Sequence, residues 1–70
     1  MKQYELKLSK SLGENSFDSL TINTFCDKDL WKDATERLFH TIIGACDCVA
    51  RIEYERYGNI EVARIIYKEL

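Results

Sequence analysis

The stretch ARIEYERYGNIEVARIIY, residues 50–67, decides how this chain folds. Its pair Gly58–Asn59 suits a two-residue hairpin loop, because glycine adopts the positive φ angle that such a loop needs. Counting outward from this loop pairs Tyr57 with Ile60, Arg56 with Glu61, Tyr54 with Ala63, Ile52 with Ile65, Ala50 with Tyr67 and Glu53 with Arg64. One register thus gives an apolar inner row and two pairs of opposite charge, which predicts an antiparallel hairpin.

A second interpretation of the C-terminal residues 59–70 stays open at this point. Asn59 is a good helix N-cap, and Val62, Ile65, Ile66 and Leu70 then form an apolar stripe at helical spacing. We adopt the hairpin because its register explains more of the residue pattern than the helix does.

Two further strands are predicted near the N-terminus. Polar and apolar residues alternate from Gln3 to Ser9, which is typical of a half-buried strand. Residues 13–16 supply turn chemistry, and a second strand is expected from Ser19 to Cys26, with Leu20 and Ile22 pointing inward. These two runs predict an antiparallel hairpin.

The segment Lys28 to Ala45 has a helical period. Asp27 or Asp29 can cap this helix, and acidic residues suit its positive N-terminal end. Charged residues fall on the solvent side and form the pairs Asp33–Arg37 and Lys32–Glu36, while an apolar arc holds Leu30, Trp31, Ala34, Leu38, Ile42, Ala45 and Cys46.

These elements predict one domain, residues 1–70, of the α+β class with the order ββαββ, in which a single helix packs on one face of a four-stranded antiparallel sheet. One helix covers one face of such a sheet, so the other face stays open. The residues expected there are Phe25, Arg51, Glu53, Tyr57, Ile60, Val62, Arg64, Ile66 and Lys68.

This open face is the predicted partner-binding surface, because aromatic residues and arginine are typical of interface cores. We expect Phe25, Arg51, Glu53, Tyr57, Arg64 and Ile66 to contact a protein partner. An acidic group at the start of the helix, Asp29, Asp33 and Glu36, is a second candidate, because acidic patches dock on basic surfaces. A homodimer formed by the same face or by a hairpin edge is compatible with this reading.

The composition excludes several classes of function. The chain has 70 residues and a net charge of −2, and no apolar run is long enough to cross a membrane. No export signal opens the chain, so we expect a cytoplasmic protein in which Cys26, Cys46 and Cys48 are reduced thiols. These cysteines and His40 lack zinc-ligand spacing, and no nucleophile–base pair stands out. We therefore expect no enzyme activity, metal or cofactor.

Nucleic-acid binding is the alternative function. Sheet faces that bind RNA present aromatic rings to bases and basic residues to phosphates. Tyr57, Arg51 and Arg64 fit these roles, but the acidic residues of the same hairpin, Glu53 and Glu55 among them, oppose phosphate binding.

The order of elements also resembles a known class of proteins. A strand hairpin, a helix that starts with acidic residues, the run Val49-Ala50-Arg51-Ile52-Glu53 and a terminal hairpin together resemble small phage- or prophage-encoded anti-CRISPR proteins, above all inhibitors of type I complexes. The resemblance lies in element order and covers most of the chain, and no functional residue is carried over from it. It implies a stoichiometric inhibitor that binds a host CRISPR–Cas or other defence complex in the host cell cytoplasm.

Overall fold

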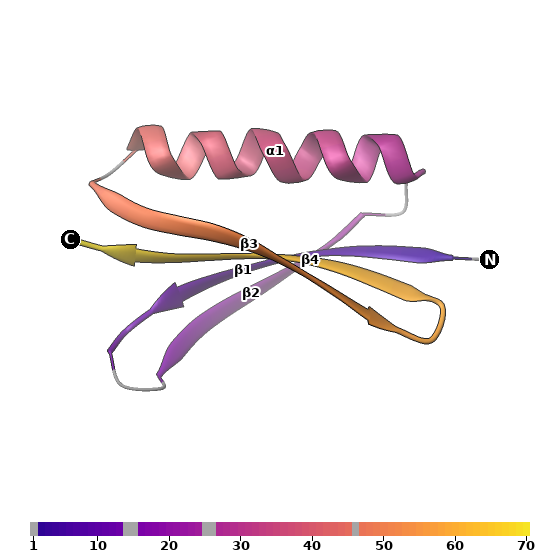
Figure 1. The fold of residues 1–70 in the computed structure, drawn as a ribbon, viewed down its shortest axis with the longest axis horizontal. Coiled ribbons are helices and arrows are strands. Elements are labelled where there is room, and N and C mark those ends of the chain that lie inside the picture. The colour runs from indigo at the N-terminus through magenta and orange to yellow at the C-terminus, as the bar shows by residue number, and fades with distance from the viewer. Residues whose placement is uncertain (1, 14–15, 25–26, 46) are drawn as a thin grey trace.

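The computed structural model describes residues 2–13, 16–24, 27–45 and 47–70, which form one helix and four strands in two layers (Figure 1). The elements are β1 (Gln3–Ser11), β2 (Phe17–Thr24), α1 (Lys28–Ala45), β3 (Cys48–Tyr57) and β4 (Ile60–Glu69). The predicted order ββαββ is confirmed, and β4 rules out a C-terminal helix. No helix among the described residues is long and apolar enough to cross a membrane.

The prediction of a purely antiparallel sheet is wrong. The strand order is β2-β1-β4-β3, and the two central strands, β1 and β4, are parallel. In Figure 1 the arrows of β1 and β4 point the same way, whereas β2 and β3 run the other way at the two edges. The cause is the connection through α1, which carries the chain over the sheet so that β3 starts at the end where β2 started. Each hairpin then reverses direction once, which leaves β1 and β4 parallel.

The central position of β4 follows from its sequence. Strands that are buried on both faces are nearly continuous in apolar residues. In β4, Ala63 and Ile65 are fully buried on the helix side, while Val62 and Ile66 are 1% and 8% exposed on the other side. The strand with apolar residues buried on both faces therefore takes the centre, and β3, none of whose residues is fully buried, takes an edge.

The β3–β4 hairpin has the predicted register at every pair, from Tyr57–Ile60 to Ala50–Tyr67. Gly58 has a φ of 57°, so the loop uses the left-handed conformation that glycine favours. The first hairpin is longer than predicted in β1, and β2 begins at Phe17 instead of Ser19.

Helix α1 has the predicted bounds, Lys28 to Ala45, because its first turn is capped. The Asp27 carboxylate accepts a hydrogen bond from the Leu30 amide at 2.9 Å, which satisfies one of the free N–H groups at the helix start. The predicted Asp33–Arg37 ion pair is present, at 2.9 Å between the guanidinium and the carboxylate.

Trp31 attaches the helix to the sheet. Its side chain is 3% exposed, and its indole N–H donates to the Glu5 carbonyl of β1 at 2.9 Å. The ring also lies against Tyr4 of β1 and edge-on to Tyr54 of β3, with centroid distances of 5.1 and 5.9 Å. The core cluster is completed by Leu6, Ala63 and Ile65, with Leu8, Ala34, Leu38, Phe39, Ile42 and Ile52 packed around it.

The helix covers β1, β4 and β3 and leaves β2 largely bare. Leu20 was predicted to be inside and lies on the helix side of the sheet, where β2 pairs it with Leu8. It is nevertheless 59% exposed, because the helix packs on the other three strands. Leu30 was placed in the apolar arc of the helix and is 57% exposed.

Candidate protein-binding surface

The face of the sheet opposite the helix is open, as predicted. Strand alternation places Arg51, Glu53, Tyr57, Arg64 and Ile66 on this face. Phe25, the sixth residue predicted there, lies outside the described residues.

Charged side chains of this open face are largely paired with one another. Arg51 donates to the Glu53 carboxylate at 3.0 Å, and Arg64 lies 3.7 Å from the Glu55 carboxylate. Glu53 stands opposite Arg64 in the register, as predicted, but its ion pair is with Arg51 on its own strand. These contacts neutralise the middle of the face within the molecule itself.

Tyr57 belongs to the same set of contacts. Its hydroxyl donates to the Glu55 carboxylate at 2.7 Å. This hydrogen bond, together with the negative charge of Glu55, raises the pKa of Tyr57 above its ordinary value of 10.0. The hydroxyl of Tyr57 is therefore a satisfied donor that stays protonated at neutral pH.

Two apolar residues of the open face are not available to a partner in the way that the sequence indicated. Val62 is 1% exposed and Ile66 is 8% exposed. The side chain of Arg64 is 31% exposed, and its Nε is buried without a hydrogen-bond partner. The centre of the open face is thus a closed layer of side chains.

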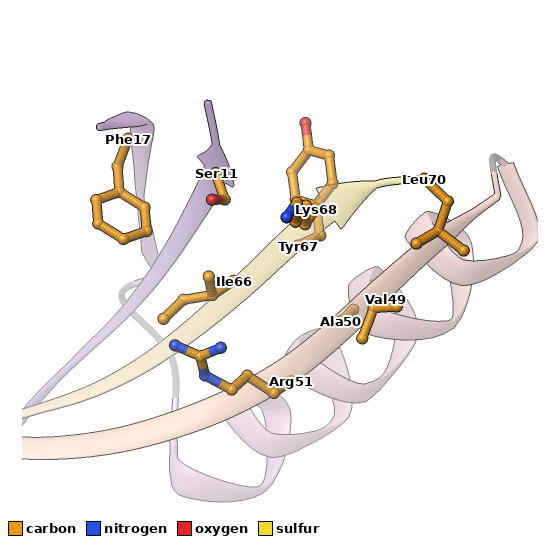
Figure 2. Close-up of a pocket in the computed structure, with 9 residues that line it drawn as sticks. All are labelled: Ser11, Phe17, Val49, Ala50, Arg51, Ile66, Tyr67, Lys68 and Leu70. Atoms are coloured by element: carbon orange, nitrogen blue, oxygen red, sulfur yellow. The ribbon is translucent and has the colours of Figure 1, made fainter. Parts of the chain in front are cut away.

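The accessible apolar surface lies at one end of the open face. There the end of β1, the start of β2, the start of β3 and the end of β4 surround a hollow of about 410 Å³ (Figure 2). We call it the distal hollow, and it is lined by Ser11, Phe17, Val49, Ala50, Arg51, Ile66, Tyr67, Lys68 and Leu70.

Three large apolar side chains of the distal hollow face solvent. Phe17, Val49 and Leu70 are 52%, 61% and 86% exposed. Figure 2 shows them around Ile66, with Phe17 on one side and Val49 and Leu70 on the other. Apolar side chains that gather in this way on a small domain mark interaction sites more often than isolated ones do.

Two cationic residues border the distal hollow. Arg51 is engaged by Glu53, whereas Lys68 is exposed and has no ion-pair partner among the described residues. Arg51 and Ile66 are the predicted site residues that the structure brings together here. Tyr57, at the far end of β3, is separated from Val49 by about 27 Å of extended chain.

The acidic candidate group is on a different surface. Asp29, Asp33 and Glu36 are exposed on α1, and they lie on the side of the helix that faces away from the sheet. Asp33 is held by Arg37. The two predicted sets of residues therefore form two surfaces of opposite layers instead of one site.

The sequence analysis missed Phe17, Val49 and Leu70. The sequence contained the signal for Val49, because Val49 is two residues before Arg51 on the same strand and therefore shares its face. Phe17 was not identified because the second strand was predicted to start at Ser19. In the structure, Phe17 belongs to β2 and pairs with Ser11.

A second cleft, of about 490 Å³, lies between the first half of α1 and the β3–β4 hairpin, and its lining includes Lys28, Lys32, Arg56 and Glu61. Arg56 donates to the Glu61 carboxylate at 2.6 Å, and Lys2 lies 3.7 Å from the same oxygen. The hydrogen bond from Arg56, which contributes most, and the positive charges of Lys2, Arg56 and Lys28 lower the pKa of Glu61 below its ordinary value of 4.5.

The predictions about cysteine and metal chemistry fall partly outside the described residues, which omit Cys26 and Cys46. The thiol of Cys48 is half-buried, and its Sγ lies 3.5 Å from the Ile42 carbonyl oxygen. Within the described part of the chain, no group of three or more His, Cys, Asp or Glu side chains is arranged to hold a metal ion.

In comparisons with known proteins, the chain matches no family model, no curated protein and no solved structure.

Proposed function

We propose that this chain is a non-enzymatic protein-binding module that holds its partner in the distal hollow. The observation that carries the proposal is the exposure of Phe17, Val49 and Leu70 around Ile66 at one end of the open face. Removing such side chains from water stabilises a complex by about 25 cal/mol for each Å² of apolar area. The middle of the open face offers a partner less, because Arg51 is paired with Glu53 and Arg64 with Glu55.

The charges around the distal hollow favour a particular kind of partner. Arg51 and Lys68 border the apolar floor, and Lys68 has no ion-pair partner in the described part of the chain. A protein segment that inserts an apolar side chain and carries a carboxylate beside it fits this arrangement. Complementary charge of this kind speeds association and selects the partner more than it strengthens binding.

The more specific form of the proposal is an inhibitor of a host CRISPR–Cas or other defence complex, encoded by a phage or mobile element. Its support is the resemblance in element order. An interference assay tests it: expression of the chain should restore phage growth on a host with an active type I system, and Val49→Glu should abolish the rescue. Unchanged phage growth with the wild-type chain would reject this form.

A capture experiment tests the general proposal. A partner retained by the wild-type chain should be lost with Val49→Glu and weakened with Lys68→Glu. Ile43→Glu is the matched control, because Ile43 is 44% exposed on α1, in the other layer. Equal retention by all three variants would remove the distal hollow as the binding site.

The same preparation separates protein binding from the nucleic-acid alternative. Binding to DNA or RNA would weaken steeply with salt, because bound cations displace counterions from phosphates. We expect no such binding at low salt, since Arg51 and Arg64 are paired with carboxylates and the Tyr57 hydroxyl donates to Glu55.

A further inference from the structure

The outer edge of strand β2 is uncovered, and this suggests an interaction separate from the proposed function. In the described part of the chain, β2 is the last strand on its side of the sheet. Its described side chains, Phe17 to Thr21, are all exposed, and α1 packs mainly on the other strands. An edge strand presents a row of unpaired backbone N–H and C=O groups, which is a template for another strand.

The opposite edge of the sheet is protected and β2 is not. Natural proteins guard sheet edges with charged side chains or with a covering element. The edge strand β3 carries four charged residues, Arg51, Glu53, Glu55 and Arg56, and it lies under the helix. The described side chains of β2 carry a single charge, at Asp18, and β2 holds no proline.

The hydrogen-bond pattern identifies which backbone groups of β2 are free. The Leu12 amide donates to the Ser16 carbonyl at 2.9 Å, one pair beyond Ser11–Phe17, the last pair of the β1–β2 register. Antiparallel pairs alternate between bonded and non-bonded, so residues 18, 20 and 22 direct their N–H and C=O groups to β1. The groups of Phe17, Ser19, Thr21 and Asn23 therefore point outward.

This pattern selects one register for a second copy of the chain. Antiparallel pairing around a two-fold axis at Leu20 places Ser19 opposite Thr21 of the partner copy and Phe17 opposite Asn23. All four outward-pointing residues then have partners, which no other two-fold register achieves. Leu20 faces Leu20 of the second copy as a non-bonded pair, the type in which side chains approach most closely. The side chain of Leu20 is 59% exposed in the single chain, and pairing of the two copies buries it.

Charge is also compatible with self-association at this edge. In the register centred on Leu20, Asp18 stands opposite residue 22 of the partner copy. The two Asp18 carboxylates are then separated by about 13 Å along the strands. This distance exceeds the Debye length of about 8 Å at physiological ionic strength, so their repulsion is screened.

We infer that two copies of this chain pair through β2 and form a continuous eight-stranded sheet with both helices on one face. The two-fold axis is perpendicular to the sheet, so both distal hollows lie on the opposite, open face. The interface consists of strand backbone and one leucine pair, which is small compared with the roughly 1,200–2,000 Å² of stable complexes. Dissociation in the micromolar range is therefore expected.

Sedimentation equilibrium of the purified chain, without any partner, tests the inference. The mass should rise from that of one chain to twice that value between low-micromolar and sub-millimolar concentrations. Leu20→Glu should keep the mass at one chain, because two carboxylates would face each other. Thr21→Pro should do the same, because it removes only an outward-pointing N–H group. Ile43→Glu, on α1, and Val49→Glu, in the distal hollow, should dimerise like the wild type.

A single-chain mass for the wild type over the whole range would overturn the inference, as would a dimer that persists in Leu20→Glu. Hydrogen exchange adds a check by residue: the amides of Ser19 and Thr21 should become protected as concentration rises, whereas Leu20 is protected throughout. This result is independent of the proposed function, since Val49→Glu removes partner binding and leaves the mass unchanged.

Discussion

The two hairpins of this sheet have strands of similar length, 9 and 8 residues in the first and 10 and 10 in the second, but different surroundings. The β3–β4 hairpin supplies Val62, Ala63, Ile65 and Ile66, which are buried on both faces of one strand. The β1–β2 hairpin contributes Leu6 and Ser9 to the buried set, and every described side chain of β2 is exposed. The single helix packs on three strands, so it covers both strands of the second hairpin but only β1 of the first.

The largest effect is expected at Trp31, which joins the helix to both hairpins. Trp31→Ala removes its contacts with Tyr4 and Tyr54 and the hydrogen bond to Glu5. The free energy of unfolding is expected to fall by about 3–5 kcal/mol for such a change. That is much of the stability of a 70-residue domain, so the variant should unfold at far lower urea concentration. A midpoint close to that of the wild type would show that the two layers hold together without Trp31.

Leucine and isoleucine truncations compare the hairpins directly. Ile65→Ala, at a fully buried position of β4, should cost about 2–5 kcal/mol. Leu12→Ala, at the 57% exposed end of the first hairpin, should cost less than about 0.5 kcal/mol. Urea unfolding followed by tryptophan fluorescence measures both. Equal losses would mean that the first hairpin is as tightly built as the second.

Gly58 tests how the register of the second hairpin is fixed. Its φ of 57° is unfavourable for residues with a Cβ atom, although the space around it is empty. Gly58→Ala should therefore cost about 1 kcal/mol through backbone strain alone. Gly58→Asn should cost less, because asparagine tolerates this conformation. An alanine variant as stable as the wild type would show that the register does not depend on glycine in this turn.

The smallest effect is expected at Glu61, and it depends on pH. Because the cations around Glu61 lower its pKa in the folded chain, its stabilising contribution is present above pH 4.5. The contribution is lost as the pH falls through the lowered value. Glu61→Gln should thus be less stable than the wild type at pH 7, and the two should converge in acid. A difference that is independent of pH would assign the role of Glu61 to packing.

The parts of the fold that were predicted from the sequence are those fixed by local chemistry. The Gly58–Asn59 loop determines the register of its hairpin, and the Asp27 cap together with the apolar period determines the bounds of α1. These features depend on neighbours within a few residues, so the sequence displays them directly.

The sheet order and the distal hollow depend on contacts between distant segments. Which strands become neighbours is decided by packing, and the parallel pairing of β1 with β4 was missed because each hairpin alone is antiparallel. The apolar run of β4 held the signal, since Val62 and Ile66 continue the apolar pattern onto the second face. Likewise, Phe17, Val49 and Leu70 form one hollow only after the sheet assembles four strand ends.

The pairing of β1 with β4 also determines when this chain can fold during synthesis. Gln3 pairs with Ile60 and Lys10 with Tyr67, so the first strand finds its central neighbour only after the last strand has been made. Until then, Leu6 and Trp31 lack most of the layer that buries them. Contacts of such long sequence separation slow folding, because loop closure precedes any gain from packing. The nascent chain therefore displays these apolar side chains until β4 has been synthesised.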